Sequence, residues 1–475
     1  MRWFEEKNDH FWIGLFAFAI MLNLFAIYNS DLGLDVHVKS AYVEEGEGYV
    51  LDWGDTRQSD PDASNPEQAT IINSPPLISN PIASLLFLVL IFIGLSRLNK
   101  NIPLIGLILL HPTVIFSSGK SYDELMVLSI FGMGALMLTN AYRNSENMKI
   151  RLGHKLIAYS IMISAILFKL NFDHWAELYC LGIAIAAIFT IYIPKFNPNP
   201  RILLVGGFLS GVMTIILLGL AGYGTSKIIF DEPARFLYSL PFALFDVVII
   251  YSLFGMIIWP YVLPTWEKMK HSKDDLTSEL SLIVGGLAGL ITAYVAVLWT
   301  YESTLWESDW PWHMFTMGNN GRYITMIAIP VWILIIRVNE GIDWKNKKVF
   351  LGILLILPFS LLAGIHGQTM WTDEAADSMD LEEGEHFLFV SDATLGMHWL
   401  YTFHEPLDAE KNNITGHWRS DQSSWLYDLD SSLSHINWLV LAPEIDELPE
   451  GWQISDSGEA DYLNGGGTWK VLVRL

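Results

Sequence analysis

Repeated apolar blocks restrict the fold of this chain more than any other feature of its sequence. Each block runs for about 18–22 residues, the length that an α-helix needs to cross the roughly 30 Å hydrocarbon core of a bilayer. About eleven such blocks occur, which predicts a polytopic α-helical membrane protein with about eleven transmembrane helices. They lie near residues 11–29, 82–98, 102–118, 124–142, 155–171, 177–194, 202–223, 241–262, 281–300, 323–338 and 349–366.

Composition agrees with this class. Of the 475 residues, 52% are hydrophobic and only 17% are charged, whereas a soluble chain of this length would form domains of near-average composition. The first block is too long for a signal peptide and lacks a small-residue cleavage site. Phosphate-binding P-loop, CxxC and HExxH motifs do not occur in the sequence, and GGLAG at 285–289 indicates close helix packing. No nucleic-acid partner is expected.

The basic residues of the short loops predict the orientation of the chain in the cell membrane. With a cytoplasmic N-terminus, the Lys- and Arg-containing loops at 143–155, 268–273 and 337–348 all lie inside. A long first loop at 30–80 and the segment after Ile365 then lie outside. We therefore expect a multi-pass plasma-membrane protein whose C-terminal part is extracytoplasmic.

Two domains are expected, a transmembrane bundle at 1–366 and a soluble domain at 367–475. The second segment is acidic and rich in tryptophan, and it contains short apolar runs such as HFLFV and WLVLA beside turn residues such as NGGG. Such runs predict strands, and a segment of this size can bury a small core. The sequence predicts a small α+β extracytoplasmic domain.

The first loop carries Asp31, Asp35, His37 and Lys39 just beyond the first apolar block. Most acids of this loop fit a solvated surface. Asp35 differs because it lies in the apolar frame GLDVHV, which must pack close to the bundle. A partly desolvated carboxylate has a raised pKa and is suited to act as a general base.

The later outer loops bring further charged residues to the same face. SSGKSYDEL contains Lys120, Asp123 and Glu124, although acids at this position also fit a helix N-terminal cap. Arg235 and Arg322 lie at membrane edges on a strongly acidic face, so each needs an anionic partner such as a carboxylate or a lipid phosphate. Asp246 lies inside an apolar block, where a structural ion pair with either arginine is an alternative to a substrate role.

The order of these elements resembles the C-type membrane glycosyltransferases that use polyprenyl-phosphate sugars, a superfamily that includes protein O-mannosyltransferases and aminoarabinose transferases. The matching residues are Asp35-Val36, Ala41, GYVLDW at 48–53, Ser74-Pro75-Pro76-Leu77, SSGKSYDELMVL and GRYITMIAIP at 321–330. They cover about residues 10–335 as separate short motifs in the family's order. Val36 and Ser74 depart from the family, which usually has Glu and a Lys or His at these places.

The resemblance implies transfer of a sugar from a polyprenyl-phosphate donor to a hydroxyl of a protein, lipid or glycan at the outer membrane face. Asp35 is then the catalytic base. Substrate or phosphate contacts are assigned to His37, Lys39, Lys120, Asp123, Arg235, Arg322 and Tyr323. No cofactor and no metal ligand is assigned. A divalent metal stays open, although Val36 leaves one acid where the family usually has two.

Two other classes of function remain open. One is a membrane transporter, for which Asp246 would be a coupling site. The other is a non-catalytic membrane protein whose outer domain binds a partner or a glycan through its tryptophans. Membrane lipids are expected partners in every case. A transporter should place its polar residues at mid-membrane, whereas a glycosyltransferase should gather Asp35, Arg322 and Lys120 or Arg235 at one outer site.

Overall fold

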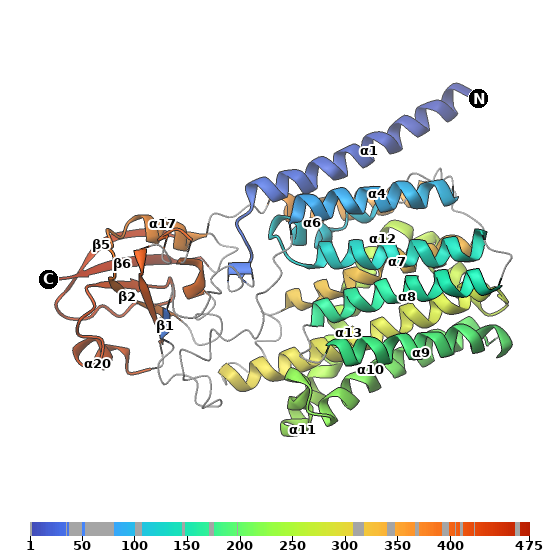
Figure 1. The fold of residues 1–475 in the computed structure, drawn as a ribbon. Coiled ribbons are helices and arrows are strands. Elements are labelled where there is room, and N and C mark those ends of the chain that lie inside the picture. The colour runs from blue at the N-terminus through green and yellow to red at the C-terminus, as the bar shows by residue number, and fades with distance from the viewer. Residues whose placement is uncertain are drawn as a thin grey trace. The chain divides into compact units, whose positions relative to one another are not determined.

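The chain forms two compact units in the computed structural model (Figure 1). The bundle unit comprises Met1–Asn29, Ser79–Tyr301 and Met314–His366, and the sheet unit comprises Ser30–Ile78, Glu302–His313 and Gly367–Leu475. The structure describes residues 2–34, 36–37, 50–52, 80–99, 107–144, 148–170, 175–196, 198–306, 318–339, 347–365, 370–391, 399–403, 405–408, 412–421, 423–460 and 466–475. The first loop, which the sequence assigned to the bundle domain, thus groups with the C-terminal segment.

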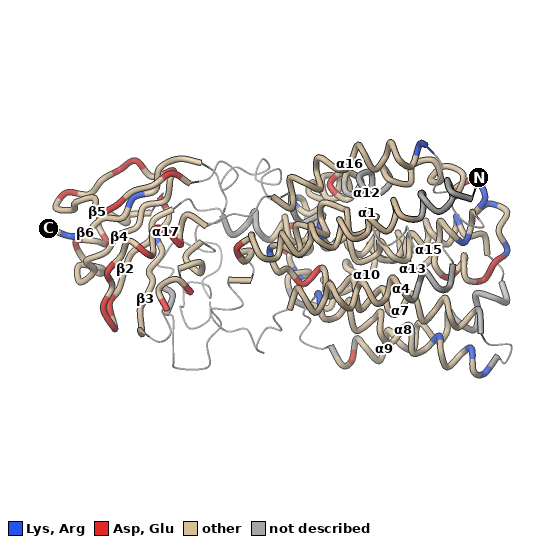
Figure 2. Tube along the Cα trace, turned by 90° about the horizontal axis from the view of Figure 1, so that it is seen from above, with Lys and Arg blue, Asp and Glu red and all other residues tan. Residues whose placement is uncertain are grey.

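The bundle unit is helical. Its α-helices are α1 (Arg2–Asn29), α4 (Pro81–Asn99), α6 (Pro112–Gly119), α7 (Glu124–Asn144), α8 (Met148–Leu170), α9 (Trp175–Phe196), α10 (Pro200–Leu220), α11 (Ile228–Asp231), α12 (Pro233–Met269), α13 (Asp275–Trp306), α15 (Ala328–Val338) and α16 (Lys347–Ile365). Two 3₁₀ helices, η2 (Gly224–Lys227) and η3 (Gly318–Ile327), also lie in this unit. Lys and Arg gather at the end of the bundle where α1 begins (Figure 2).

Six of these helices are long and apolar enough to cross a membrane. Within the described residues they are His10–Asn29, Glu124–Tyr142, Lys149–Lys169, Pro200–Leu220, Asp275–Tyr301 and Lys347–Ile365. A membrane protein is therefore supported, but the predicted count of eleven spans is not confirmed. Two predicted spans have a different form: α6 has only 8 residues, and the block at 323–338 begins within η3 before the 11 residues of α15. Neither α-helix alone reaches across about 30 Å of hydrocarbon.

The break before α6 is stabilised by side chains from distant helices. Pro112 occupies the first turn of α6, and the His111 side chain accepts a hydrogen bond from the Thr113 backbone N–H at 3.2 Å. Asn23 of α1 donates to the Leu109 carbonyl at 2.8 Å, and Ser360 of α16 donates to the Leu110 carbonyl. Backbone groups freed by a helix break inside a bilayer need such partners, because the hydrocarbon core contains no water to hydrogen-bond them.

Glycines bring α10 and α13 into direct backbone contact. A Cβ atom added at Gly211 would lie 2.0 Å from the Gly286 carbonyl oxygen, and one at Gly289 would lie 1.9 Å from the Phe208 carbonyl oxygen. Only glycine permits this approach. The close packing expected for GGLAG is therefore confirmed.

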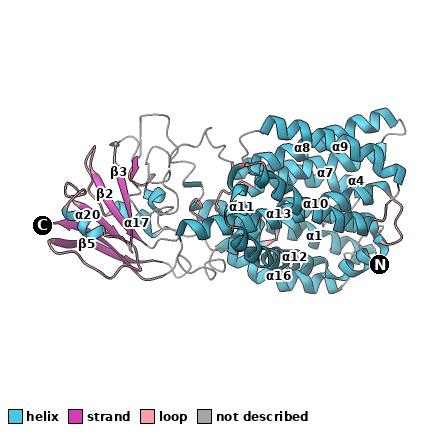
Figure 3. Cartoon of the chain, turned by 90° about the horizontal axis from the view of Figure 1, so that it is seen from below, coloured by secondary structure: helices cyan, strands magenta, loops and turns pink. Residues whose placement is uncertain are grey.

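The sheet unit contains a six-stranded mixed sheet in the order β1-β3-β2-β4-β6-β5. Strands of this sheet are drawn in magenta in Figure 3. Its strands are β1 (Val50–Asp52), β2 (His386–Ser391), β3 (Thr415–Ser420), β4 (Trp438–Leu441), β5 (Trp452–Glu459) and β6 (Thr468–Arg474). β1, β3, β2 and β4 run parallel to one another. β6 pairs antiparallel with β4 on one side and with β5 on the other. The small sheet domain expected at the C-terminus is confirmed, and the first loop contributes its edge strand, with Asp52 in register with His417.

Short helices and aromatic side chains cover this sheet. The helices are α17 (Trp371–Asp377), η4 (Tyr401–Phe403) and α20 (Trp425–Asp430). Five of the six residues of β2 are buried, which is typical of a strand covered on both faces. Trp371 of α17 stacks on Trp469 of β6 with ring centroids 6.4 Å apart, and Phe403 packs 5.4 Å from Phe389. The tryptophans at 371, 418, 425 and 469 are therefore core residues of the unit.

Candidate functional site

The turn between α6 and α7 places several of the predicted site residues. After α6, the Tyr122 N–H bonds the Ser117 carbonyl at 3.0 Å and the Ser121 N–H bonds the Ser118 carbonyl at 3.3 Å. This is the hydrogen-bond pattern of a Schellman motif, and Ser121 takes its left-handed position with φ of 55°. Glycine is usual at such a position, and few other residues adopt this left-handed backbone conformation, as Ser121 does here. The tight turn brings Lys120 and Asp123 to the start of α7, and both are buried.

Glu124, the first residue of α7, is the centre of a buried charged group that we call the Glu124 cluster. It contains Glu124, Lys169, Arg322, Tyr122 and Tyr323. Lys169 Nζ lies 2.7 Å and Arg322 Nε lies 3.1 Å from Glu124 Oε1. The Glu124 and Arg322 side chains are only 2% and 4% exposed, so this ion pair is desolvated.

Aromatic faces hold the two cations of the cluster. The Arg322 guanidinium lies 3.9 Å from the ring centroid of Tyr122 and 5.3 Å from that of Tyr323, while Lys169 Nζ lies 4.5 Å from the Tyr323 ring. Such contacts add cation–π attraction, which grows when water is excluded. Four segments contribute: the turn that holds Tyr122, the start of α7, the last turn of α8 and the 3₁₀ helix η3.

Two cations of the Glu124 cluster meet on one carboxylate oxygen. Lys169 and Arg322 both contact Oε1, whereas the buried Oε2 atom has no hydrogen-bond partner within the described residues. Both cations are thus held beside one carboxylate in a largely buried setting. The arrangement is suited to hold an anionic group such as a phosphate, which arginine and lysine both bind well.

A second buried group, the Glu279 cluster, lies at the opposite end of α8. Lys155 of α8 pairs with Oε1 of Glu279 near the start of α13. Tyr142 of α7 donates to the same oxygen at 2.5 Å, and Tyr159 donates to Oε2 at 3.0 Å. Here one cation faces one carboxylate, and both carboxylate oxygens accept hydrogen bonds. This group has the composition of a structural ion pair.

The structure describes some of the residues that the sequence assigned to a single site. Arg322 and Tyr323 belong to the Glu124 cluster, and Lys120 and Asp123 lie in the turn that leads to it. Arg235, at the start of α12, lies 3.7 Å from Glu232 and is partly exposed.

Of the three first-loop residues assigned to the site, His37 alone lies within the described residues. It is buried, belongs to the sheet unit and lies in a short turn in which its N–H bonds the Gly33 carbonyl at 3.1 Å. Asp35 and Lys39 lie outside the described residues, so the proposed base remains a prediction.

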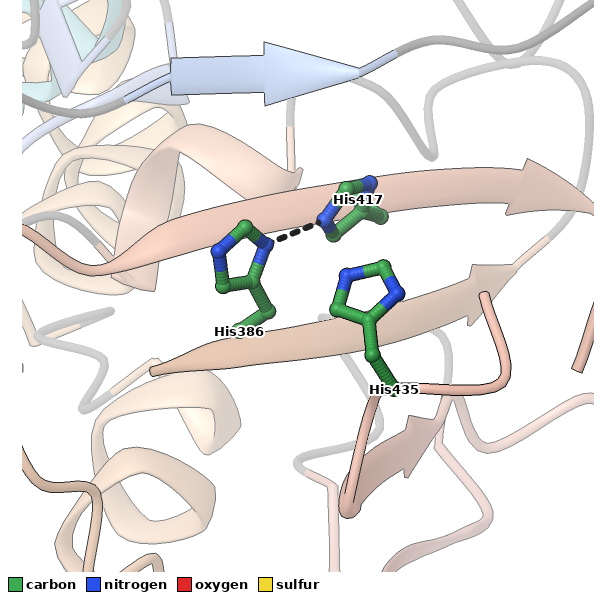
Figure 4. A group of neighbouring side chains, drawn as sticks. All are labelled: His386, His417 and His435. Atoms are coloured by element: carbon green, nitrogen blue, oxygen red, sulfur yellow. Dashed lines mark hydrogen bonds between the residues drawn. The ribbon is translucent and has the colours of Figure 1, made fainter. Parts of the chain in front are cut away.

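Three histidines of the sheet unit could hold a metal ion. His386 begins β2, His417 lies in β3 and His435 precedes β4, and one ring nitrogen of each lies within 4.8 Å of the others (Figure 4). The sequence assigned no metal ligand and gave no local signal for these three histidines, because the parallel pairing of β2 with β3 and β4 is what brings them together.

Sequence reasoning also missed Lys169. This residue ends an apolar block, where a lysine reads as a membrane-edge residue near a helix C-terminus. The signal that could have found it is the antiparallel pairing of α7 and α8, which sets the end of one helix beside the start of the other. Glu124 was noted in the sequence only beside Asp123, as a helix cap or as part of an outer charged group.

Comparison with known proteins adds no family to this description. No protein-family model, no curated protein and no solved structure was found to match the chain.

Proposed function

We propose that the protein is a membrane glycosyltransferase that moves a sugar from a polyprenyl-phosphate donor to a hydroxyl acceptor at the outer membrane face. The observation that carries this proposal is the Glu124 cluster, in which Lys169 and Arg322 converge on one carboxylate oxygen at one end of the bundle. A lipid-linked sugar leaves behind a phosphate anion, and desolvated cations stabilise such a leaving group.

The distribution of basic residues supports the sidedness. Lys and Arg gather at the bundle end where α1 begins, which agrees with a cytoplasmic location for that end. The Glu124 cluster lies at the other end of α7 and α8, which would then face outward. A donor whose lipid tail stays in the bilayer presents its phosphate at this depth, near the end of the spanning helices.

Glu124 would act as a positioning residue. It holds Lys169 and Arg322 in one place before the donor arrives, so that little reorganisation accompanies the reaction. Tyr122 and Tyr323 restrict the two cations from their sides. General base catalysis remains assigned to Asp35, on the grounds of its apolar sequence frame and the family resemblance.

The test begins with a deletion strain, in which lipid-linked sugars and surface glycans are measured by mass spectrometry. Loss of one glycan together with accumulation of a lipid-linked sugar is the expected result. Purified protein then transfers sugar from that donor, and Asp35→Asn should reduce the rate by about 10²–10⁴-fold. Glu44→Gln, in the same loop, is the matched control and should retain activity. An unchanged rate in Asp35→Asn would remove this residue from the base role.

A transporter is the second candidate, and the break before α6 favours it. Interrupted helices in a membrane bundle often border a substrate site. The Glu124 cluster argues for the enzyme, since Glu124 begins α7 and Lys169 lies in the last turn of α8 rather than at its middle. Uptake of a solute by sealed proteoliposomes, without any glycosyl transfer in detergent, would favour the transporter.

A further inference from the structure

We propose that His386, His417 and His435 form a binding site for a divalent transition-metal ion of the Zn²⁺ type in the sheet unit. The proposal is independent of the glycosyltransferase function, because it concerns residues of the sheet unit alone. It starts from the geometry of three imidazoles contributed by β2, β3 and the turn before β4 (Figure 4).

The nitrogen positions suit a metal of this size. His386 Nδ1 and His417 Nε2 lie 2.9 Å apart, and all three candidate ligand atoms lie within 4.8 Å of one another. A tetrahedral Zn²⁺ ion with Zn–N bonds of about 2.0–2.1 Å holds its nitrogen ligands about 3.3–3.4 Å apart. The 2.9 Å separation lies just below this value and the 4.8 Å limit lies above it, so the three nitrogens are within the range from which side-chain adjustment can bring them onto one ion.

The strands provide a rigid frame for two of the ligands. His386 is the first residue of β2 and is in register with Thr415 of the parallel strand β3, two residues before His417. Residues two apart in a strand face the same side of the sheet, which explains why the two rings meet. Their ring centroids are 5.2 Å apart at an interplanar angle of 22°. A metal site on strands is held more accurately than one on loops.

The exposed third ligand, His435, gives a metal ion access to the site from solvent. His435 is exposed, and its ring lies edge-on to those of His386 and His417 at centroid distances of 5.0 Å and 6.0 Å. His417 is buried and His386 is half-buried. An ion can therefore enter from the His435 side, and a site with three protein ligands keeps a fourth position for water or another donor.

Packing alone is a weak explanation for this group. Imidazole nitrogen is a common metal ligand and suits Zn²⁺, Cu²⁺ and Ni²⁺. Three aromatic hydrocarbon rings would fill the same space without placing three ring nitrogens beside one another.

Binding would join three segments that are far apart in the sequence. Such a cross-link stabilises the native state, since the unfolded chain does not present the three ligands together. The expected role of the ion is therefore to hold the start of β2, the strand β3 and the turn before β4 together. Its fourth coordination position would be open to a further oxygen ligand.

The test uses the full chain in detergent, purified without a polyhistidine tag and treated with a chelator. Titration with Co²⁺, followed by its visible absorption, and with Zn²⁺, followed by calorimetry, should show about one ion per chain, as a three-ligand site requires. His435→Gln changes an exposed residue, so its fold should persist, and its Zn²⁺ affinity should fall by at least about tenfold. His271→Gln alters an exposed histidine of the bundle unit and should leave affinity unchanged.

His417→Gln serves as the second variant, and its fold is checked by circular dichroism. Loss of binding in both cluster variants, with retention in His271→Gln, supports the site. Equal affinity in wild-type protein and His435→Gln, or no binding to the wild-type chain, would overturn it. Equal loss in the His271→Gln control would also overturn it, because binding would then be unspecific.

Discussion

Glu124 and Glu279 are both buried carboxylates of the same bundle, yet their surroundings differ in one respect. Glu279 receives one lysine and two tyrosine hydroxyls, and these donors use both of its oxygens. Glu124 receives a lysine and an arginine on one oxygen. In the first arrangement both oxygens accept hydrogen bonds, whereas in the second two cations share one oxygen. The proposed donor-phosphate site rests on this difference, because arginine and lysine both bind phosphate.

Removal of Lys155 should have the largest effect on the stability of the bundle. Lys155→Met leaves Glu279 charged and buried without a cation, so the free energy of unfolding should fall by about 3–5 kcal/mol. Adding Glu279→Gln should recover much of this loss, because the uncompensated charge disappears. Thermal unfolding in detergent, followed by tryptophan fluorescence, measures both. Lys149→Met, at an exposed position of the same helix, is the control. A loss below about 1 kcal/mol would contradict a structural role.

Removal of Arg322 should reduce sugar transfer while the protein stays folded. Arg322→Ala leaves Glu124 paired with Lys169 at 2.7 Å, so the bundle should stay folded. Sugar transfer should fall by roughly 10²–10³-fold, the usual cost of losing one donor to a developing anion. Arg322→Lys should recover only part of the rate, since a point charge does not replace a guanidinium fork. Transfer assays and melts are compared directly; normal transfer by Arg322→Ala would remove the cluster from the site.

Asp373 extends the comparison to a carboxylate whose charged neighbours are acids. Burial, followed by Asp31, Glu405 and other acids, raises its pKa from 3.8 to about 7. The native state thus binds more protons than the unfolded state between about pH 4 and pH 7, and stability falls as the pH rises through this window. Asp373→Asn should remove that fall and stabilise α17 by about 1–2 kcal/mol at pH 8, allowing for screening.

Hydrogen exchange of the α17 and β2 amides, corrected for intrinsic rates, measures this local stability at pH 5 and pH 8. The exposed Glu383 provides the control variant Glu383→Gln, which should keep the wild-type pH dependence. An unchanged pH dependence in Asp373→Asn would assign the effect to other acids.

Arg235 should give the smallest effect. Its partner Glu232 is three residues away, 3.7 Å distant and partly exposed, so this pair contributes about 0.2–0.5 kcal/mol. Arg235→Ala should therefore leave the melt almost unchanged and should reduce transfer far less than Arg322→Ala does. If transfer is lost to the same degree, the start of α12 also contacts the donor, as the sequence predicted.

The sequence predicted the long helices well because their signal is local. The apolar blocks near 124–142, 202–223 and 281–300 correspond to α7, α10 and α13. The block at 102–118 misled because hydropathy continues through His111 and Pro112, where the helix begins anew. Proline and the distant side chains Asn23 and Ser360 decide this break, and a window of neighbouring residues does not contain them.

Site residues were harder to predict for the same reason. Arg322 stood out as a basic residue at a membrane edge, but its partner Glu124 is far away in the sequence and looked like a helix cap. Lys169 and His435 gave no local signal, since each gains its role from helix or strand pairing. Chemical type is visible in a sequence, whereas the partners of a charged group depend on tertiary structure.

The edge strand β1 has a consequence for biosynthesis. Val50 is in register with Thr415, so the strand leaves the ribosome long before its partner β3 exists. At about 5–20 residues per second, the interval is on the order of tens of seconds, during which all the later membrane helices must be inserted. β1 therefore stays without this partner during the interval, and the sheet gains its edge strand only after β3 has been synthesised. Truncation after the last apolar helix would remove β3 and leave Val50–Asp52 without the strand on which they pair.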